Sequence, residues 1–327
     1  MYAVYAKAPN PTNPLAALAA GERSQPQPAP GWVLVQVRAA SLNMHDVNTL
    51  RGVRMDPARY PMILGCDGSG ELADGTEVVL HSCVPAPGWV GPEELDPGRT
   101  VLSERYPGSF AEAVAVPERN AVPKPASMSH IEAACLPTAW LTAYRMLFVN
   151  SRAHPGQTIL VDARDRLGSI NGAVVALARK AGFEVWVATG RDRDRVAATE
   201  LGAHRVFPAG KRPDRLVDAV FDAGIDEAGW SHATDLVRPG GTVVCAGWRS
   251  GTSTIGYRMA LDDLIFREVR VVGSTMGTVT DLANLLAFLD RTGLRPQVAG
   301  EFPLSRAGEA IGVMLAGRTS GKLVLTA

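Results

Sequence analysis

Cysteine is scarce in this chain: its 327 residues include four cysteines, and none of them form a C-x-x-C pair. A disulfide framework of the kind found in small secreted domains is therefore not expected. The first residues also lack the charged and apolar regions of a signal peptide and instead begin directly with a strand-like segment. Together these features predict a protein of the reducing cytoplasm.

Net charge and long apolar runs are lacking as well. The 33 basic and 33 acidic residues balance to a formal net charge of zero, which gives no general attraction to nucleic acid or to an anionic membrane. No apolar run approaches the roughly 20 residues that a membrane-spanning helix needs. With 46% hydrophobic residues, the chain is expected to be a soluble, globular protein of one large or two ordinary domains.

The first 120 residues have the pattern of short strands and turns. Segments 33–39 and 77–80 are rich in β-branched and apolar residues, and each follows a turn that contains glycine. Segment 83–108 is rich in proline and glycine and shows little periodicity. It is predicted to be a long loop, and such loops often act as lids over binding sites.

From about residue 131 the pattern changes to helices alternating with strands. The predicted helices are 131–147, 168–181, 192–201, 231–236 and 281–290, and the predicted strands are 158–161, 184–188, 205–207, 219–222, 241–246, 269–273 and 322–325. Alternation of this kind predicts an α/β fold with a doubly wound parallel sheet.

Segment 158–173 lies where such a fold holds a nucleotide, but it lacks two of the three glycines of the G-x-G-x-x-G fingerprint. If Gly168 is the third glycine, the first two positions carry Ala163 and Asp165. Arg164 or Arg166 could grip a phosphate beside the helix N-terminus. Alternatively, the carboxylates of Asp162 and Asp165 repel the phosphate, and the fold persists without its ligand. The sequence of the loop leaves both interpretations open.

Seven motifs along the chain resemble those of the medium-chain dehydrogenase/reductases. They are AASLNMHDVNTLRG (39–52), YPMILGCDGSG (60–70), GSFAEAVAVP (108–117), LPTAWLTAY (136–144), RPGGTVVCAG (238–247), GSTMGT (273–278) and GRTSGKLVL (317–325). The resemblance implies a GroES-like β-rich catalytic domain formed by residues 1–122 and 276–327, with a Rossmann nucleotide-binding domain at 123–275. It also implies an active site in the cleft between them.

The zinc alcohol dehydrogenases of this family hold a catalytic zinc with Cys, His and Cys. The matching positions here carry Asn43, Cys66 and Thr138, of which only the cysteine is a good zinc ligand. The four-cysteine lobe that holds a structural zinc is absent as well. The resemblance therefore narrows to the zinc-free, quinone-oxidoreductase-like branch, and no metal site is expected.

The resemblance places Asn43, His45 and Thr138 at the catalytic centre. An imidazole at position 45 could relay protons, or it could be a surface or ribose-contacting histidine, which is the favoured interpretation. Cys66 is expected to be a small buried side chain, and Asp67, which replaces the family's usual glutamate, could pair with an arginine.

For the cofactor, the spacing of Thr138 and Thr142 puts both on one helical face, where the resemblance implies that Thr142 lies beside the nicotinamide. Alternatively, both hydroxyls bond to helix carbonyls. Arg191 favours NADP because an arginine there suits a 2′-phosphate, although it could also belong to a solvated helix start. Met276 could approach the nicotinamide or lie in the core. The full set of predicted cofactor-binding residues is Thr142, Arg164, Gly168, Ser169, Arg191, Asp222, Gly247, Ser274, Met276 and Lys322.

Two functions are compatible with these features. The first is a zinc-independent, NADPH-dependent oxidoreductase that acts on a small quinone, enone or related carbonyl by hydride transfer. The second is a family member that has lost redox activity with its glycine loop and acts as a non-redox enzyme or binding protein. In either case the resemblance implies a homodimer that pairs through strand 269–273, whose edge would otherwise be open.

Overall fold

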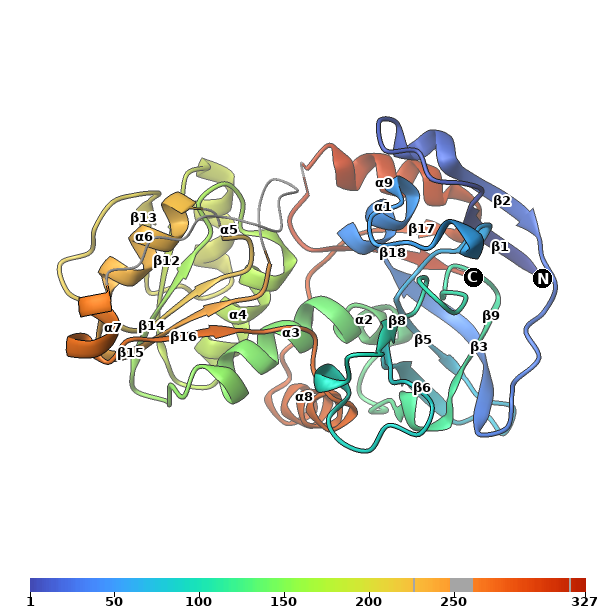
Figure 1. Cartoon of the computed structure of the whole chain (residues 1–327), viewed down its shortest axis with the longest axis horizontal. Coiled ribbons are helices and arrows are strands. Elements are labelled where there is room, and N and C mark those ends of the chain that lie inside the picture. The colour runs from blue at the N-terminus through green and yellow to red at the C-terminus, as the bar shows by residue number, and fades with distance from the viewer. Residues whose placement is uncertain (226, 248–260, 318) are drawn as a thin grey trace. The chain divides into compact units, whose positions relative to one another are not determined.

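The computed structural model describes residues 1–225, 227–247, 261–317 and 319–327 (Figure 1). The chain forms two compact units, the first made of Met1–Leu141 and Met276–Ala327 and the second of Thr142–Thr275. Residues 123–141, which we assigned to the Rossmann domain, fall within the first of these units. None of the helices in the described part of the chain has the length and apolar character of a membrane span.

The main sheet of the first unit is built around β3 (Trp32–Ser41), which pairs with β5, β9 and β18. In the middle of β3, Val35 and Val37 are buried while Gln36 and Arg38 are exposed, which is the alternation of a strand with one covered face. The seven-stranded sheet has the order β10-β6-β5-β3-β18-β17, with β9 paired to β3. Its other strands are β5 (Asp67–Glu71), β6 (Glu77–Leu80), β9 (Ala113–Pro117), β10 (Ala121–Pro123), β17 (Val298–Pro303) and β18 (Lys322–Thr326).

Smaller sheets and helices complete the first unit. The strands are β1 (Tyr2–Ala6), β2 (Leu18–Glu22) and β4 (Met62–Ile63) in one sheet, and β7 (Cys83–Val84) with β8 (Thr100–Val101) in another. The helices are α1 (Met44–Arg51), α2 (His130–Ala134), α8 (Val279–Thr292) and α9 (Ala307–Leu315), and short 3₁₀ turns lie at Pro14–Ala17, Pro57–Arg59, Glu93–Leu95, Glu118–Asn120 and Leu304–Arg306. The predicted loop at 83–108 is thus irregular apart from one short strand pair and one turn.

The second unit contains a six-stranded parallel sheet with the order β13-β12-β11-β14-β15-β16, which confirms the predicted doubly wound sheet (Figure 1). Every residue of β11 is buried, as a central strand with both faces covered requires. Its strands are β11 (Thr158–Asp162), β12 (Glu184–Thr189), β13 (Arg205–Pro208), β14 (Val217–Asp222), β15 (Val237–Cys245) and β16 (Arg270–Gly273), and its helices are α4 (Gly168–Lys180), α5 (Asp192–Glu200), α6 (Glu227–Leu236) and α7 (Leu261–Arg267).

The prediction of one regular helix at 131–147 is wrong. The chain runs from α2 into a π-helical turn at Leu136–Trp140, then through α3 (Leu141–Tyr144) into a second π-helical turn at Arg145–Asn150. Pro137 lies at the start of the first π turn and has no backbone N–H to donate, which disfavours a continuous α-helix there. Such π turns are frequent at functional sites, and this one carries Thr138.

Candidate functional site

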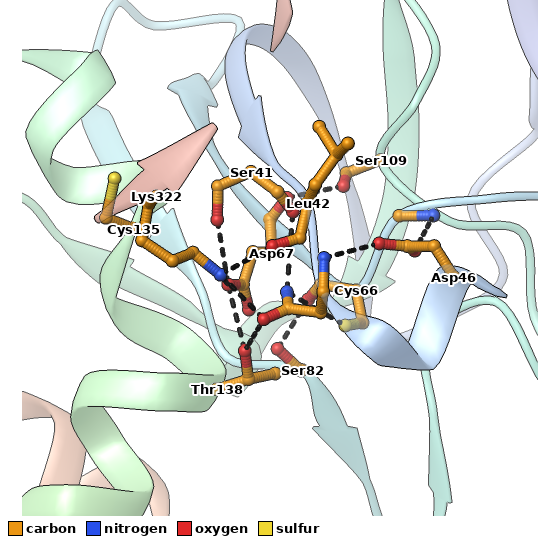
Figure 2. Close-up of polar contacts among 12 residues, drawn as sticks. Ser41, Leu42, Asp46, Cys66, Asp67, Ser82, Ser109, Cys135, Thr138 and Lys322 are labelled. Carbon is orange, nitrogen blue, oxygen red and sulfur yellow. Dashed lines mark hydrogen bonds and ion pairs between the residues drawn. The ribbon is translucent and has the colours of Figure 1, made fainter. Parts of the chain in front are cut away.

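Asp67, the first residue of β5, lies at the centre of a buried polar cluster in the first unit. Its side chain is fully buried, and its Oδ2 atom accepts hydrogen bonds from the hydroxyl of Ser41 at 2.9 Å and from that of Thr138 at 2.9 Å (Figure 2). The ammonium of Lys322 lies 3.2 Å from the same oxygen. We call these residues, together with Asn43 and Cys66, the Asp67 cluster.

Lys322 supplies the positive charge of the cluster. Its Nζ contacts the carbonyl of Leu42 at 2.8 Å, Oδ1 of Asn43 at 2.6 Å and Oδ2 of Asp67 at 3.2 Å. An ammonium has three hydrogens, so these acceptors satisfy it completely, and its side chain is only 2% exposed. The expected arginine partner of Asp67 was therefore wrong, because a lysine holds the position. These contacts place Lys322 in the Asp67 cluster, whereas the resemblance assigned it to the cofactor.

Strand register explains how residues so distant in the sequence meet. On neighbouring strands Val324 of β18 lies opposite Ser41 of β3, and Ser41 lies opposite Asp67 of β5. Lys322 lies two residues before Val324 and therefore on the same face of the sheet. Its long side chain can then reach across β3 to the carboxylate.

Asn43 and Thr138 complete the cluster. Thr138 has a single hydroxyl hydrogen, and two acceptors lie within reach, Oδ1 of Asn43 at 2.8 Å and Oδ2 of Asp67 at 2.9 Å. The amide nitrogen of Asn43 lies 3.4 Å from the carbonyl of Ser41 and 3.5 Å from Sγ of Cys66. Each side chain is thus held in place by neighbours that accept from its donors or donate to its acceptors.

The donor set of this cluster does not fit a zinc ion. Burial, followed by the nearby carboxylates of Asp67 and Asp46, raises the pKa of the Cys66 thiol well above its usual value. The thiol therefore stays protonated, whereas zinc binds the thiolate. Asn43 and Thr138 offer only an amide and a hydroxyl, and Oδ1 of Asn43 already contacts the ammonium of Lys322.

His45 lies outside the Asp67 cluster. It belongs to α1, where its Nδ1 is 3.9 Å from a carboxylate oxygen of Glu104, and its buried Nε2 has no hydrogen-bond partner among the described residues. The next residue, Asp46, fastens the loop instead, since its carboxylate accepts the amides of Asn43 at 2.7 Å and Gly65 at 3.0 Å. Burial raises the pKa of Asp46 to about 6.

In the second unit, the start of α4 is the predicted phosphate site. One of its backbone amides already donates a hydrogen bond to a carboxylate of the protein. The backbone N–H of Leu167, the N-cap of α4, donates to Oδ2 of Asp194 at 3.0 Å, and Asp194 is 3% exposed. Helix N-terminal amides and the helix dipole are the groups that would bind a pyrophosphate. One of the amides at this end of the site is therefore already used within the protein.

The arginine beside this loop is also engaged within the protein. Both Nε and one terminal nitrogen of Arg164 lie 3.4 Å from Oδ2 of Asp162, a fully buried carboxylate at the end of β11. Nδ1 of His232, from α6, lies 3.1 Å from the same oxygen. Arg164 therefore neutralises an internal charge, and of the two arginines considered for the phosphate only Arg166 is exposed.

At the adenosine end the structure is more favourable. Arg191 is the exposed N-cap residue of α5, directly after β12, where a 2′-phosphate could approach it from solvent. Gly190 precedes it, and a Cβ there would lie 3.0 Å from the carbonyl of Arg164. The guanidinium of Arg191 is thus open to solvent at this end of the sheet.

The remaining predicted cofactor residues lie at strand ends and helix starts. Asp222 ends β14 with its Oδ1 accepting the amide of Gly224 at 2.7 Å, and Ser274 follows β16 with its hydroxyl 2.9 Å from Nδ2 of Asn150. The others are Thr142 (buried, first residue of the second unit), Gly168 and Ser169 (first turn of α4), Gly247 (after β15) and Met276 (first unit, φ 43°).

Sequence reasoning missed Asp194 and His232. Asp194 was one of several alternating charges at the start of a predicted solvated helix, and nothing in that run distinguishes the one carboxylate that turns inward. His232 lay in a helix without a motif. Both contacts depend on how α5 and α6 pack against the sheet.

We expect Lys322→Met to lower the free energy of unfolding by about 3–5 kcal/mol, because it leaves the buried carboxylate of Asp67 without its partner. Adding Asp67→Asn should restore part of this loss by removing the unpaired charge. Urea unfolding would measure both. Arg306→Met, which breaks the exposed pair with Glu309, is the control and should cost less than about 1 kcal/mol. Strictly additive effects of the two cluster substitutions would contradict the pairing.

Cobalt provides a test of the expected absence of catalytic zinc. Co²⁺ added to the protein should give no thiolate-to-metal charge-transfer absorption, because Cys66 stays a thiol and Lys322 fills the cation position. A near-ultraviolet band that disappears in Cys66→Ala would show that the metal binds here after all.

Comparisons with known proteins agree with this architecture. Residues 29–126 match the family model of the alcohol dehydrogenase GroES-like domain, and residues 170–291 match that of the zinc-binding dehydrogenases. The chain is 24% identical over 303 residues to the quinone oxidoreductase of Rattus norvegicus, which covers 87% of this chain and 85% of the relative. It is 25% identical over 324 residues to the acryloyl-coenzyme A reductase of Metallosphaera sedula, which covers 93% of this chain and 95% of that protein.

Solved structures give the same result. The structure of an NAD-dependent alcohol dehydrogenase superposes with a TM-score of 0.88 at 28% identity and covers 100% of both chains. The crotonyl-CoA carboxylase/reductase AntE in complex with NADP has the same fold, with a TM-score of 0.87 at 22% identity over 100% of this chain and 94% of that one. The GroES-like fold of the first unit and the Rossmann fold of the second are thus confirmed, and the chain belongs to the medium-chain dehydrogenase/reductase superfamily.

Proposed function

We propose that this oxidoreductase of the medium-chain superfamily works without zinc, uses NADPH, and reduces a small quinone, enone or related carbonyl by hydride transfer. The observation that carries the proposal is the ammonium of Lys322, which lies among the residues that replace the family's zinc ligands. A cation is thus retained at this position, but it is a fixed part of the protein.

The substrate class follows from what this cluster can and cannot supply. A metal ion polarises a carbonyl as a Lewis acid. The hydrogens of Lys322 all have acceptors within the protein, and the hydroxyl of Thr138 faces two more. Strong electrophilic assistance is therefore lacking, which favours a substrate that accepts hydride readily because it is conjugated. The relatives named for a quinone and for acryloyl-coenzyme A support such a class, since both compounds are conjugated acceptors.

A nicotinamide cofactor would supply the hydride when bound. Arg191 supports the phosphorylated form, because its exposed guanidinium at the N-cap of α5 can pair with a 2′-phosphate. The chain's own contribution would be to hold the adenosine phosphate at this position. No step is assigned to the pyrophosphate, since Asp194 occupies the amide that should bind it.

That same carboxylate favours a second candidate, a superfamily member that has lost redox activity and uses its fold as a non-redox enzyme or binding protein. With Asp194 on Leu167 and Arg164 on Asp162, the loop is satisfied internally and the fold has no need of a nucleotide. Binding of NADPH distinguishes the two candidates.

We also propose a homodimer in a reducing, cytoplasmic compartment. β16 lies at the edge of the six-stranded sheet, and near it in sequence α7 carries Ile265 and Phe266, which are 63% and 80% exposed. Exposed apolar side chains next to an open strand edge are typical of a protein interface. The four cysteines are all free thiols, which supports a reducing compartment.

NADPH should raise the thermal midpoint of the protein more than NADH does at equal concentration, because a bound ligand stabilises the folded state by mass action. Arg191→Ala should remove the difference between the two nucleotides, and Arg212→Ala, an exposed arginine paired with Asp235, should preserve it. If neither nucleotide at millimolar concentration moves the midpoint, the second candidate replaces the first.

The dimer should be visible by light scattering at micromolar concentration. Replacing the exposed Phe266 with Glu should convert the protein to a monomer, because a charge would be buried at the interface. Substituting Val196, an exposed apolar residue of α5 on the same unit, should leave the mass unchanged. A monomeric unmodified protein would contradict the assignment.

A further inference from the structure

Two glutamates face each other at the end of a hairpin in the first unit. Glu71, the last residue of β5, lies directly opposite Glu77, the first residue of β6. Like charges directly opposite each other on neighbouring strands are destabilising, and cationic side chains lie beside both carboxylates, Arg38 at Glu71 and Lys124 at Glu77. His130, the first residue of α2, lies over this pair, with Nε2 3.1 Å from Oε1 of Glu77 and 3.7 Å from Oε1 of Glu71.

The hydrogen bonds of His130 determine which of its ring nitrogens carries the hydrogen in the neutral form. The hydroxyl of Ser69 donates its single hydrogen to the carbonyl of Val78 at 2.7 Å, so Nδ1 of His130, 2.9 Å away, must donate to Ser69. In a neutral imidazole Nε2 then carries a lone pair, and that lone pair would face two carboxylates. Nε2 is buried, and Oε1 of Glu77 lies within hydrogen-bond distance of it at 3.1 Å. If Nε2 carried the hydrogen instead, the hydroxyl of Ser69 would have to donate to Nδ1. Its 2.7 Å contact with the carbonyl oxygen of Val78 would then contain no hydrogen.

The carboxylates are held in place from outside. Arg38 binds Glu71 through two parallel hydrogen bonds of 3.0 and 2.9 Å, and Lys124 lies 3.0 Å from Oε2 of Glu77. Oriented carboxylates and a histidine whose second nitrogen has a fixed partner are features of metal ligands.

We propose that Glu71, Glu77 and His130 bind a divalent transition-metal ion, for which zinc is the best match. The three ligand atoms all lie within 4.8 Å of one another. Tetrahedral zinc with bonds of about 2.0–2.2 Å places its ligand atoms about 3.4 Å apart, and the two distances from Nε2, 3.1 and 3.7 Å, lie on either side of that value. The half-exposed side of Glu77 leaves a fourth position open to water.

Such an ion would be structural. It would join the first residue of α2 to the β5–β6 hairpin, and α2 leads directly into the π-helical turn that carries Thr138. The site shares no residue with the Asp67 cluster, and the proposal is independent of the proposed activity.

Zinc titrated calorimetrically into the chelator-treated full-length protein should bind at one site per chain with micromolar or tighter affinity and raise the thermal midpoint. His130→Gln and Glu77→Gln should each weaken binding at least tenfold. The matched controls His154→Gln and Glu118→Gln alter exposed residues of the same types and should have no effect. Bound Co²⁺ should give only weak d–d bands, which separates this site from thiolate ligation at Cys66.

Absence of zinc binding to the unmodified protein at micromolar concentration would overturn the proposal, as would binding that persists in His130→Gln. A third decisive outcome is a proton in place of the metal. In that case nuclear magnetic resonance would show His130 as an imidazolium at neutral pH and zinc would not displace the proton, and the proposal would again be overturned.

Discussion

The first unit depends on burying one ammonium without leaving it unpaired. A charged side chain removed from water is costly unless every hydrogen finds an acceptor and the charge finds a partner. Lys322 meets this condition only because β18 returns from the C-terminus to lie beside β3, with β5 on the other side. The carbonyl of Leu42 and Oδ1 of Asn43 supply its other contacts, and the π turn brings Thr138 to Asn43. The strand order and the shape of the site together therefore satisfy the buried charge of Lys322.

This arrangement changes the chemistry available at the site. A metal ion can accept an incoming oxygen by changing its coordination, whereas an ammonium with three fixed acceptors cannot do so without losing one of them. Cys66 remains a thiol because burial, and then the carboxylates of Asp67 and Asp46, raise the pKa of its thiol. The cluster is therefore rigid and has fixed partial charges, and under the proposed function reactivity would come from the cofactor and from the conjugation of the substrate.

Sequence patterns predicted most strands and helices of the second unit and some of those of the first, because burial on one or both faces leaves a periodic signal, as in β3 and β11. Several short strands of the first unit and its helices α1 and α9 were not predicted. They could not predict the pairings that define the sites. Lys322 and Asp67 are 255 residues apart, and Leu167 and Asp194 meet only after α5 has packed against the sheet. The helix at 131–147 failed for a local reason, since Pro137 prevents a regular hydrogen-bond ladder in a way that apolar spacing does not reveal. The predicted roles of individual site residues remain predictions.

In both units, a charged group of the protein lies where other members of the family would hold a ligand. In the first, an internal cation lies where relatives of the family hold zinc, and in the second, an internal carboxylate holds the Leu167 amide that a pyrophosphate would use. The energies show what the second replacement costs. A hydrogen bond to a charged group is worth about 1.5–3 kcal/mol, whereas micromolar binding of a nucleotide corresponds to about 8 kcal/mol. Displacing Asp194 into solvent would therefore weaken NADPH by roughly one to two orders of magnitude without abolishing its binding. For this reason the oxidoreductase remains the first candidate, with a nucleotide affinity set by how easily α5 releases that carboxylate.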